Sequence, residues 1–149
     1  MPVRELANSD VVTIAPGASL VEAAQLMREN HVSELLVCQF QQGVVVPVGS
    51  LSDRDIVIGA LAIGVNLDSV CVEDIMLPIH VTIEESMGVF QAIQMMESYG
   101  LRELPVVDQH QGLVGVLSAA SLLEYLGQEL WVLSKLPARQ KSKELELRP

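Results

Sequence analysis

The chain has 149 residues, half of them apolar and only 3% aromatic, and its formal net charge is −10 at pH 7. That length suits one ordinary domain, or two small halves that share a core. The first 133 residues hold 17 acids against four bases, which argues against nucleic-acid binding. No apolar stretch is long enough to span a bilayer and no leader-like segment opens the chain. We therefore expect a cytoplasmic protein without membrane contact.

The dominant feature of the sequence is an internal repeat. Residues 12–14 (VTI) return at 81–83, and residues 34–35 (EL) return at 103–104, both at an offset of 69. Farther along each copy the offset falls to 66, as a difference in loop length would produce. Two copies of about 60 residues favour a paired module over a solenoid, which usually needs three or more units.

Each copy predicts the order strand, helix, strand, strand, helix. Ser19 and Glu22 form a capping box that opens the first helix, and the apolar residues after it recur with helical spacing. The second copy keeps this apolar stripe but has Gly88 in place of the capping serine, a weaker cap. The remaining predicted elements are strands 11–14, 35–38, 44–51, 104–107 and 113–117, and helices 53–63 and 119–133.

The order of elements predicts an α/β (α+β) fold of two β-α-β-β-α repeats. We divide the chain into a first repeat with its lead-in (1–66), a second repeat with its connector (67–133) and a C-terminal tail (134–149). The connector at 72–76 repeats the lead-in at 3–7 at the same offset of 69. Each lead-in is expected to strap across the other copy.

The two closing helices carry more apolar surface than a core of this size needs. Residues 56–63 are apolar nearly all round, and leucines line a face of the helix at 119–133. These helices either complete the core or also form an intersubunit face, and we expect a homodimer through them. The tail holds five bases and two acids, and a short mixed-charge tail is usually solvated.

Together these motifs resemble the CBS domain. The resemblance covers residues 3–130 as a tandem pair, the Bateman module, in a stand-alone prokaryotic protein. It rests on the lead-in pattern, the segment 101–108 (LRELPVVD), the segment 115–118 (GVLS), and above all 53–56 (DRDI). The resemblance implies two repeats packed about a pseudo-twofold axis. It also implies a regulatory sensor of an adenosine-containing molecule (AMP, ADP, ATP, S-adenosylmethionine or NAD), with no catalysis of its own.

A main ligand site is expected around Ser52 and Asp55, which match the Ser/Thr-x-x-Asp ribose clamp of the family. A hydroxyl and a carboxylate can meet the two hydroxyls of a ribose, and hydrogen bonds to charged groups contribute about 1.5–3 kcal/mol each. The alternative is that Asp55 only favours the helix dipole. By the family pattern Ser50 belongs to the same site, while Ile79 and the His80 backbone hold adenine.

Arg102 completes the main site in this interpretation as a fork donor to a phosphate. It is one of only four bases in the acidic body. Its alternative is a salt bridge with Glu97 or Glu103, worth at most about 1 kcal/mol if exposed.

The mirror site is expected to bind more weakly. Serine stands where the clamp needs aspartate and where the other site has Arg102. Losing the charged acceptor predicts about 10- to 150-fold weaker ribose binding. The residues of this second site are Val11, Ser33, Arg54, Ser118 and Ser121.

Other functional constellations are missing from the sequence. There is no phosphate-binding glycine loop, no nucleophile elbow and no metal-ligand spacing among the three histidines. We therefore expect no enzyme, no catalytic residue, no metal and no required cofactor. The alternative to a sensor is a ligand-free dimerisation or scaffold module that acts through protein contacts.

Overall fold

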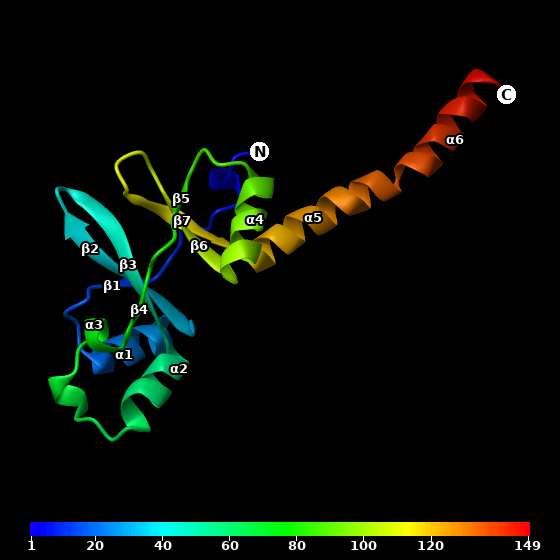
Figure 1. Ribbon diagram of the computed structural model, residues 1–149. Coiled ribbons are helices and arrows are strands. Elements are labelled where there is room, and N and C mark those ends of the chain that lie inside the picture. Colours follow the sequence, from blue (N-terminus) through cyan, green and yellow to red (C-terminus); the bar gives the residue numbers. More distant parts are fainter.

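The computed structural model describes all residues, 1–149. Two lobes lie side by side, and the last two helices run away from them to the C-terminus (Figure 1). The first lobe contains β1 (Thr13–Ile14), α1 (Leu20–Asn30), β2 (Glu34–Gln41), β3 (Val44–Ser52), α2 (Asp53–Ile56) and η2 (Val57–Leu61). The connector forms η3 (Leu67–Ser69), α3 (Val72–Ile75) and β4 (Leu77–Pro78). The second lobe contains β5 (Ile83–Glu84), α4 (Val89–Tyr99), β6 (Glu103–Val107), β7 (Leu113–Ser118) and α5 (Ala119–Ser134), with η1 (Val3–Glu5) before the first lobe and α6 (Leu136–Leu147) at the end.

The lobes share a three-stranded arrangement, which confirms the predicted β-α-β-β-α repeat, and β4 adds a fourth strand to the sheet of the first lobe. In each lobe a short first strand pairs in parallel with the second, and the second pairs antiparallel with the third. The register shifts at equivalent positions, Val37/Cys38 and Val106/Val107. The predicted first strand at 11–14 is shorter than expected, because only Thr13 and Ile14 pair.

The first helix of each repeat begins as the sequence predicts. At α1 the Ser19 hydroxyl accepts from the Glu22 N–H at 3.1 Å, and the Glu22 carboxylate accepts from the Ser19 N–H at 2.9 Å. Gly88 opens α4 without a side-chain cap. The apolar stripes are buried, and they comprise Leu20, Ala23 and Met27 in α1 and Val89, Ala92 and Met96 in α4.

The lead-ins exchange between the lobes. Val3 is fully buried in the core of the second lobe, and its N–H donates to the Met87 carbonyl at 2.8 Å. Val72 is fully buried in the core of the first lobe, and its N–H donates to the Ala18 carbonyl at 2.9 Å. The expectation that each lead-in straps across the other copy is confirmed. Each core is therefore completed by a residue from the other repeat.

Two equivalent glycines let the strapping segments cross the sheets. A Cβ at Gly115 would lie 2.5 Å from the Asn8 carbonyl oxygen, where the N-terminal segment bridges β7. A Cβ at Gly49 would overlap Met76 Sδ, where β4 pairs with β3. Such separations are shorter than real Cβ atoms show. The repeated glycine therefore marks where each lead-in crosses.

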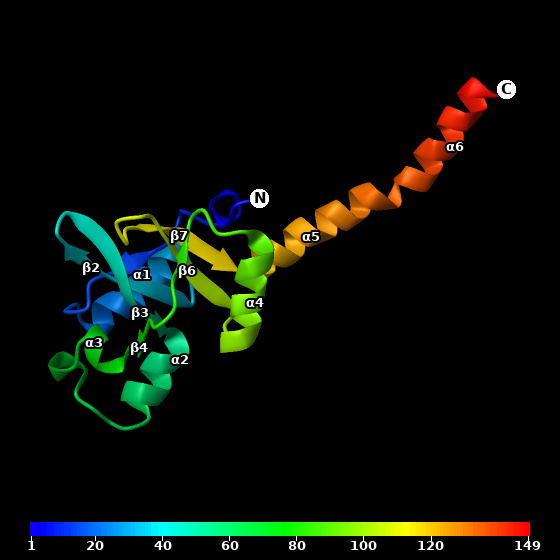
Figure 2. The ribbon, with the colours of Figure 1, turned by 45° about the horizontal axis from the view of Figure 1, so that its top comes forward.

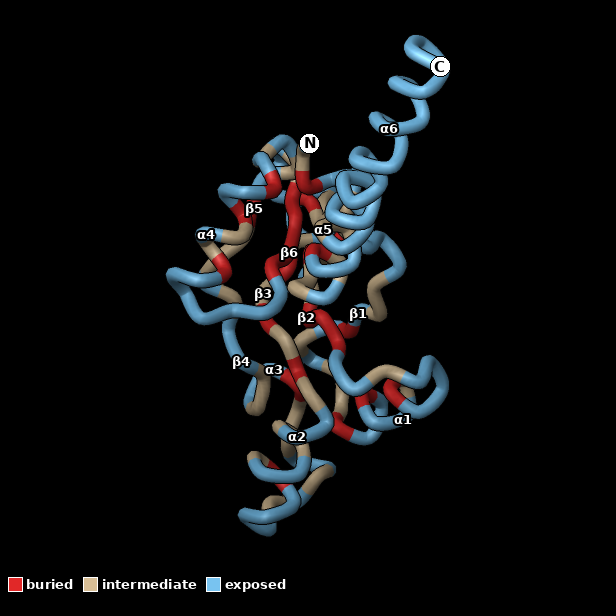
Figure 3. The backbone as a smooth tube through the Cα atoms, turned by 90° about the vertical axis from the view of Figure 1, so that its right-hand side faces the viewer, coloured by how far each residue is buried: buried red, intermediate tan, exposed pale blue.

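The helices that close the repeats differ. The predicted helix at 53–63 is a single α-turn, α2, followed by the π-helix η2. The other closing helix, α5, continues into α6 after Lys135 and leaves the body, as two views show (Figures 1 and 2). Buried residues lie along the sheets and inner helix faces, while the distal helix is exposed throughout (Figure 3). The boundaries at 1–66, 67–133 and 134–149 stay a sequence-based prediction.

No helix combines the length and the apolarity needed to cross a bilayer.

Candidate functional site

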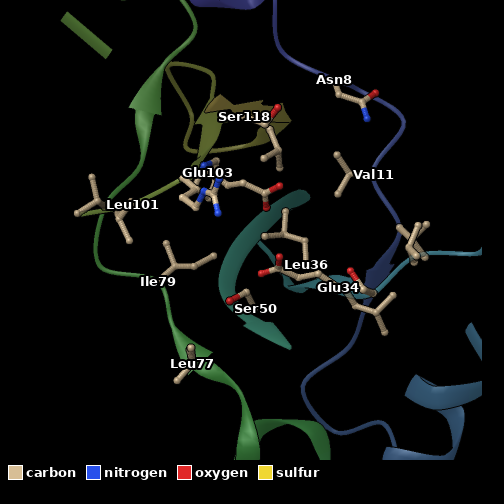
Figure 4. A pocket seen from close by; sticks show the side chains of 18 of the residues that line it. Asn8, Val11, Glu34, Leu36, Ser50, Leu77, Ile79, Leu101, Glu103 and Ser118 are labelled. Atoms are coloured by element: carbon tan, nitrogen blue, oxygen red, sulfur yellow. The ribbon is translucent and has the colours of Figure 1, made fainter. Parts of the chain in front are cut away.

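A cleft of about 860 Å³ lies between the two lobes. Its walls come from the segment before β1, the start of β2, the β4–β5 link and the start of β6. Ile79 and Val11 lie on opposite sides of the opening, with Glu34, Ser50 and Glu103 between them (Figure 4). Both repeats contribute equivalent segments, so a ligand here would touch both.

Residues predicted for two separate sites line this one cleft. The cleft-lining members of the predicted main site are Ser50, Ile79, His80 and Arg102, and those of the predicted second site are Val11, Ser33 and Ser118. Ser52, Asp55, Arg54 and Ser121 do not line the cleft.

Ser52 and Asp55 form a capping box at the start of α2. The Ser52 hydroxyl accepts from the Asp55 N–H at 3.0 Å, and Asp55 Oδ2 accepts from the Ser52 N–H at 2.8 Å. These bonds use one carboxylate oxygen and one lone pair of the hydroxyl. The Ser52 O–H and Asp55 Oδ1 form no hydrogen bond with the protein, so this box leaves one donor and one acceptor for another partner.

In the equivalent capping box at α5, both serine hydroxyls form hydrogen bonds within the box. Ser118 Oγ accepts from the Ser121 N–H at 3.1 Å, and the Ser121 hydroxyl donates to the Ser118 carbonyl at 2.9 Å. Ser121 thus reproduces the capping of Asp55 without its charge. The pair forms a natural comparison between a cap with a carboxylate and a cap without one.

The backbone holds Arg102 and Ser33 at matching positions. The Arg102 carbonyl accepts from the Ala119 N–H at 2.8 Å, and the Ser33 carbonyl accepts from the Asp53 N–H at 2.9 Å. These bonds place each residue beside the helix that closes its own repeat. The guanidinium of Arg102 forms no ion pair, since the one salt bridge in the chain joins Arg4 to Glu85 at 2.6 Å. The predicted salt-bridge alternative for Arg102 is therefore not formed.

The sequence-based site prediction did not include a pair of carboxylates that lie between the lobes. Glu34 and Glu103 occupy equivalent positions at the starts of β2 and β6, and both line the cleft. Burial against the cleft walls, followed by the nearby charge of Glu103, raises the pKa of Glu34 above its usual value. The signal was present, because the repeat retains glutamate at both positions. What sequence reasoning missed is that equivalent residues near a twofold axis meet.

The charge of the cleft lining is predominantly negative. The lining includes three acids, Asp10, Glu34 and Glu103, and Arg102 is its one arginine or lysine. No three histidine, cysteine or acidic side chains lie where they could jointly hold a metal ion.

Comparison with known proteins identifies the family. A model of the CBS domain matches twice, at residues 3–60 and 72–128. The chain belongs to the CBS domain family. Tandem CBS pairs are regulatory modules, and the predicted fold and family are both confirmed.

Sequence relatives of this CBS pair include two prokaryotic proteins. Protein MK0525 of Methanopyrus kandleri is 34% identical over 122 residues, which cover 82% of this chain but 61% of that protein, less than two thirds of its length. The CBS domain-containing protein YhcV of Bacillus subtilis is 32% identical over 120 residues, covering 80% of this chain and 81% of YhcV.

Solved structures share the fold. Hypoxic response protein I, solved with two coordinated zinc ions, has a TM-score of 0.68 and 27% identity, covering 83% of this chain and 98% of that one. The hexameric CBS-CP12 protein from bloom-forming cyanobacteria has a TM-score of 0.65 and 27% identity, covering 83% of this chain and 69% of that one. The CBS pair of protein MJ0100, in complex with 5-methylthioadenosine and S-adenosyl-L-methionine, has a TM-score of 0.68 and 23% identity, covering 87% of this chain and 98% of that one.

Proposed function

We propose that this CBS pair is a sensor that binds an adenosine-containing ligand in the cleft between its repeats. The observation that carries the proposal is the cleft itself, because equivalent segments of both repeats line its 860 Å³. That volume is within the range of small-molecule sites. The MJ0100 pair, which shares the fold, holds two adenosine-containing compounds.

The ribose would be gripped at the edge of the cleft by the α2 cap. The Ser52 hydroxyl donates to one ribose oxygen, and the free Asp55 oxygen accepts from a ribose hydroxyl. Ser50 lies on the same strand as Ser52 and faces the cleft. Ile79 and the His80 backbone take the adenine, and unpaired Arg102 takes a phosphate or carboxylate. The residues Val11, Ser33, Arg54, Ser118 and Ser121 form a second, weaker position.

The charge of the lining selects among ligands. Glu34, Glu103 and Asp10 outnumber Arg102, so a ligand with several phosphates is repelled more than one with a single negative charge or none. We therefore expect AMP or S-adenosylmethionine to bind more tightly than ATP. No required cofactor is proposed, because the ligand acts as a regulator.

Regulation would follow from binding to both lobes. A ligand that contacts both repeats favours one relative packing of the lobes, and any partner that prefers this packing gains affinity by linkage. The exchanged lead-ins link the two cores, so a shift of one lobe displaces a segment buried in the other.

A thermal-shift panel tests the proposal. AMP, ADP, ATP, S-adenosylmethionine and NAD are each added to the full chain, and the melting temperature is compared with that of free protein. A ligand at 100 times its Kd stabilises by about 2.7 kcal/mol, which is readily detected. A flat panel, confirmed by calorimetry without heat, would overturn the sensor in favour of the scaffold module.

A further inference from the structure

Two glutamates meet where the lobes face each other across the cleft. Glu34 begins β2 and Glu103 begins β6, and both line the cleft from equivalent positions of the two repeats. Figure 4 shows the two side chains inside the cleft, each coming from a different lobe. Glu34 lies within side-chain hydrogen-bonding reach of Glu103. We call these two residues the seam pair, and neither has a ligand contact in the proposed function.

A hydrogen bond within the seam pair requires a proton. An ionised carboxylate only accepts hydrogen bonds, whereas a protonated carboxyl group can donate one. Loss of water against the cleft walls favours the neutral form of Glu34, and so does the negative charge of Glu103. Both side chains stay accessible from the cleft, so the proton can exchange with solvent. The seam pair is therefore expected to titrate as a coupled unit that keeps one proton longer than an isolated glutamate does.

The neighbours of the seam pair decide which member carries the proton. Each member lies opposite the serine that caps the closing helix of its own repeat. The capping partner of that serine is Asp55 in the first repeat but Ser121 in the second. Glu34 therefore has two acidic neighbours, Glu103 and Asp55, and the charge of each opposes its ionisation. Ser121 puts no charge at the matching position beside Glu103, so the proton is expected on Glu34.

The other charged and titratable groups around the seam pair come from every wall of the cleft and from α2. Those of the cleft walls are Asp10, His31, His80 and Arg102, and those of α2, besides Asp55, are the exposed Asp53 and Arg54. An arginine or a protonated histidine favours the ionised form of Glu34, and an acid opposes it. The pKa of Glu34 is raised in the presence of all of them, through lost water first and the charge of Glu103 second.

We propose that the seam pair shares one proton, carried by Glu34, and that the pair exchanges this proton with solvent when a ligand enters the cleft. The exchange on binding rests on the proposed function, whereas the shared proton does not. An anionic ligand favours the protonated pair, because the pair then presents one negative charge instead of two. A cationic ligand favours the ionised pair. By linkage, the sensor responds to pH as well as to its ligand.

An NMR titration of the ligand-free full chain tests the shared proton. Protein labelled with 13C at the glutamate carboxyl groups is followed from pH 4 to pH 8, and Glu34 is assigned by its missing signal in Glu34→Gln. Its midpoint should lie above the usual 4.5 and should fall toward 4.5 in Glu103→Gln and in Asp55→Ser. Asp53→Ser is the matched control, because it removes an acid from the same helical turn, and it should leave the midpoint nearly unchanged.

Titration calorimetry at pH 5 and pH 7.5 tests the exchange on binding. The probes are AMP, which is an anion, and S-adenosylmethionine, whose net charge is positive. Glu34→Gln resembles the protonated carboxyl group and cannot titrate. For AMP, the ratio of wild-type Kd to Glu34→Gln Kd should rise about fivefold from pH 5 to pH 7.5, a value at the low end of typical coupling because the pair is accessible to water. For S-adenosylmethionine the same ratio should fall. Ionisation of AMP and of His31 and His80 cancels, since both proteins share it.

Two results would overturn the proposal. One is a Glu34 midpoint at the usual value that neither Glu103→Gln nor Asp55→Ser moves. The other is a Kd ratio that stays constant with pH for a probe that binds. If neither probe nor any other panel ligand binds, the exchange on binding fails together with the sensor, and the NMR titration still decides the shared proton. Circular dichroism establishes that each variant is folded.

Discussion

Replacing Asp55 with serine separates the two roles that the structure leaves to this residue. Asp55 caps α2, and one of its oxygens stays free for a ligand. Ser121 shows that serine at the equivalent position still caps a helix in this fold. Asp55→Ser should therefore retain the cap and remove the carboxylate.

Asp55→Ser is expected to weaken ligand binding much more than it weakens the fold. A hydrogen bond to a charged group contributes about 1.5–3 kcal/mol, so Asp55→Ser should raise the Kd about 10- to 150-fold. Free-protein stability should fall by only about 0.3–1 kcal/mol, through the charge lost near the helix N-terminus. Titration calorimetry with the panel ligand that gives the largest thermal shift measures the first quantity, and urea unfolding measures the second.

Asp53→Ser is the matched control. Asp53 is an exposed acid in the same first turn, and its carboxylate accepts from the Arg54 N–H at 2.7 Å. Its replacement removes the same charge from the same helix end but should leave ligand affinity within about twofold. If Asp55→Ser binds as tightly as wild type while wild type binds well, Asp55 is a cap alone and the clamp is refuted.

Other substitutions test the fold and its titratable groups. Gly115→Ala places a Cβ against the Asn8 backbone and should lower the free energy of unfolding by about 1–3 kcal/mol. Gly49→Ala should cost less, because the nearest neighbour there is the flexible Met76 side chain. Urea unfolding of both variants would rank the two losses, and equal losses would contradict the crossing geometry. The pKa of Glu34 is raised in the folded state, so the protein should lose stability as the pH rises from 4.5 through the folded pKa. Glu34→Gln should remove this loss. Urea unfolding of the wild type and the variant at pH 4.5 and pH 7 would test it. Burial raises the pKa of Cys38 to about 11. Alkylation of Cys38 at pH 8 should therefore be roughly 100-fold slower in the folded protein than in urea, as measured by peptide mass spectrometry. Equal rates would mean that the thiol is not buried.

The repeat made most of the fold predictable. The helix caps and apolar stripes are local in sequence, so the start of α1 and the buried face of α4 could be read from spacing. The matched lead-ins also predicted the strap, because a segment repeated at the same offset has the same role in both copies.

Features set by the packing of the lobes could not be read this way. The meeting of Glu34 and Glu103 depends on a twofold relation in space, and a sequence shows only that the positions correspond. The course of α6 away from the body depends on the absence of contacts beyond Lys135, which composition does not reveal. Whether Asp55 faces a ligand or its own helix depends on which oxygen the cap uses.

Burial of Val3 in the second lobe has a consequence for biosynthesis. Val3 is synthesised before the whole of both lobes, yet the pocket that receives it exists only after β7 and α5 have emerged. Val3 must therefore stay uncovered while about 120 further residues are translated, whereas Val72 is made soon after the lobe that it completes. A bulky fusion at the N-terminus should accordingly hinder maturation more than the same fusion at the C-terminus.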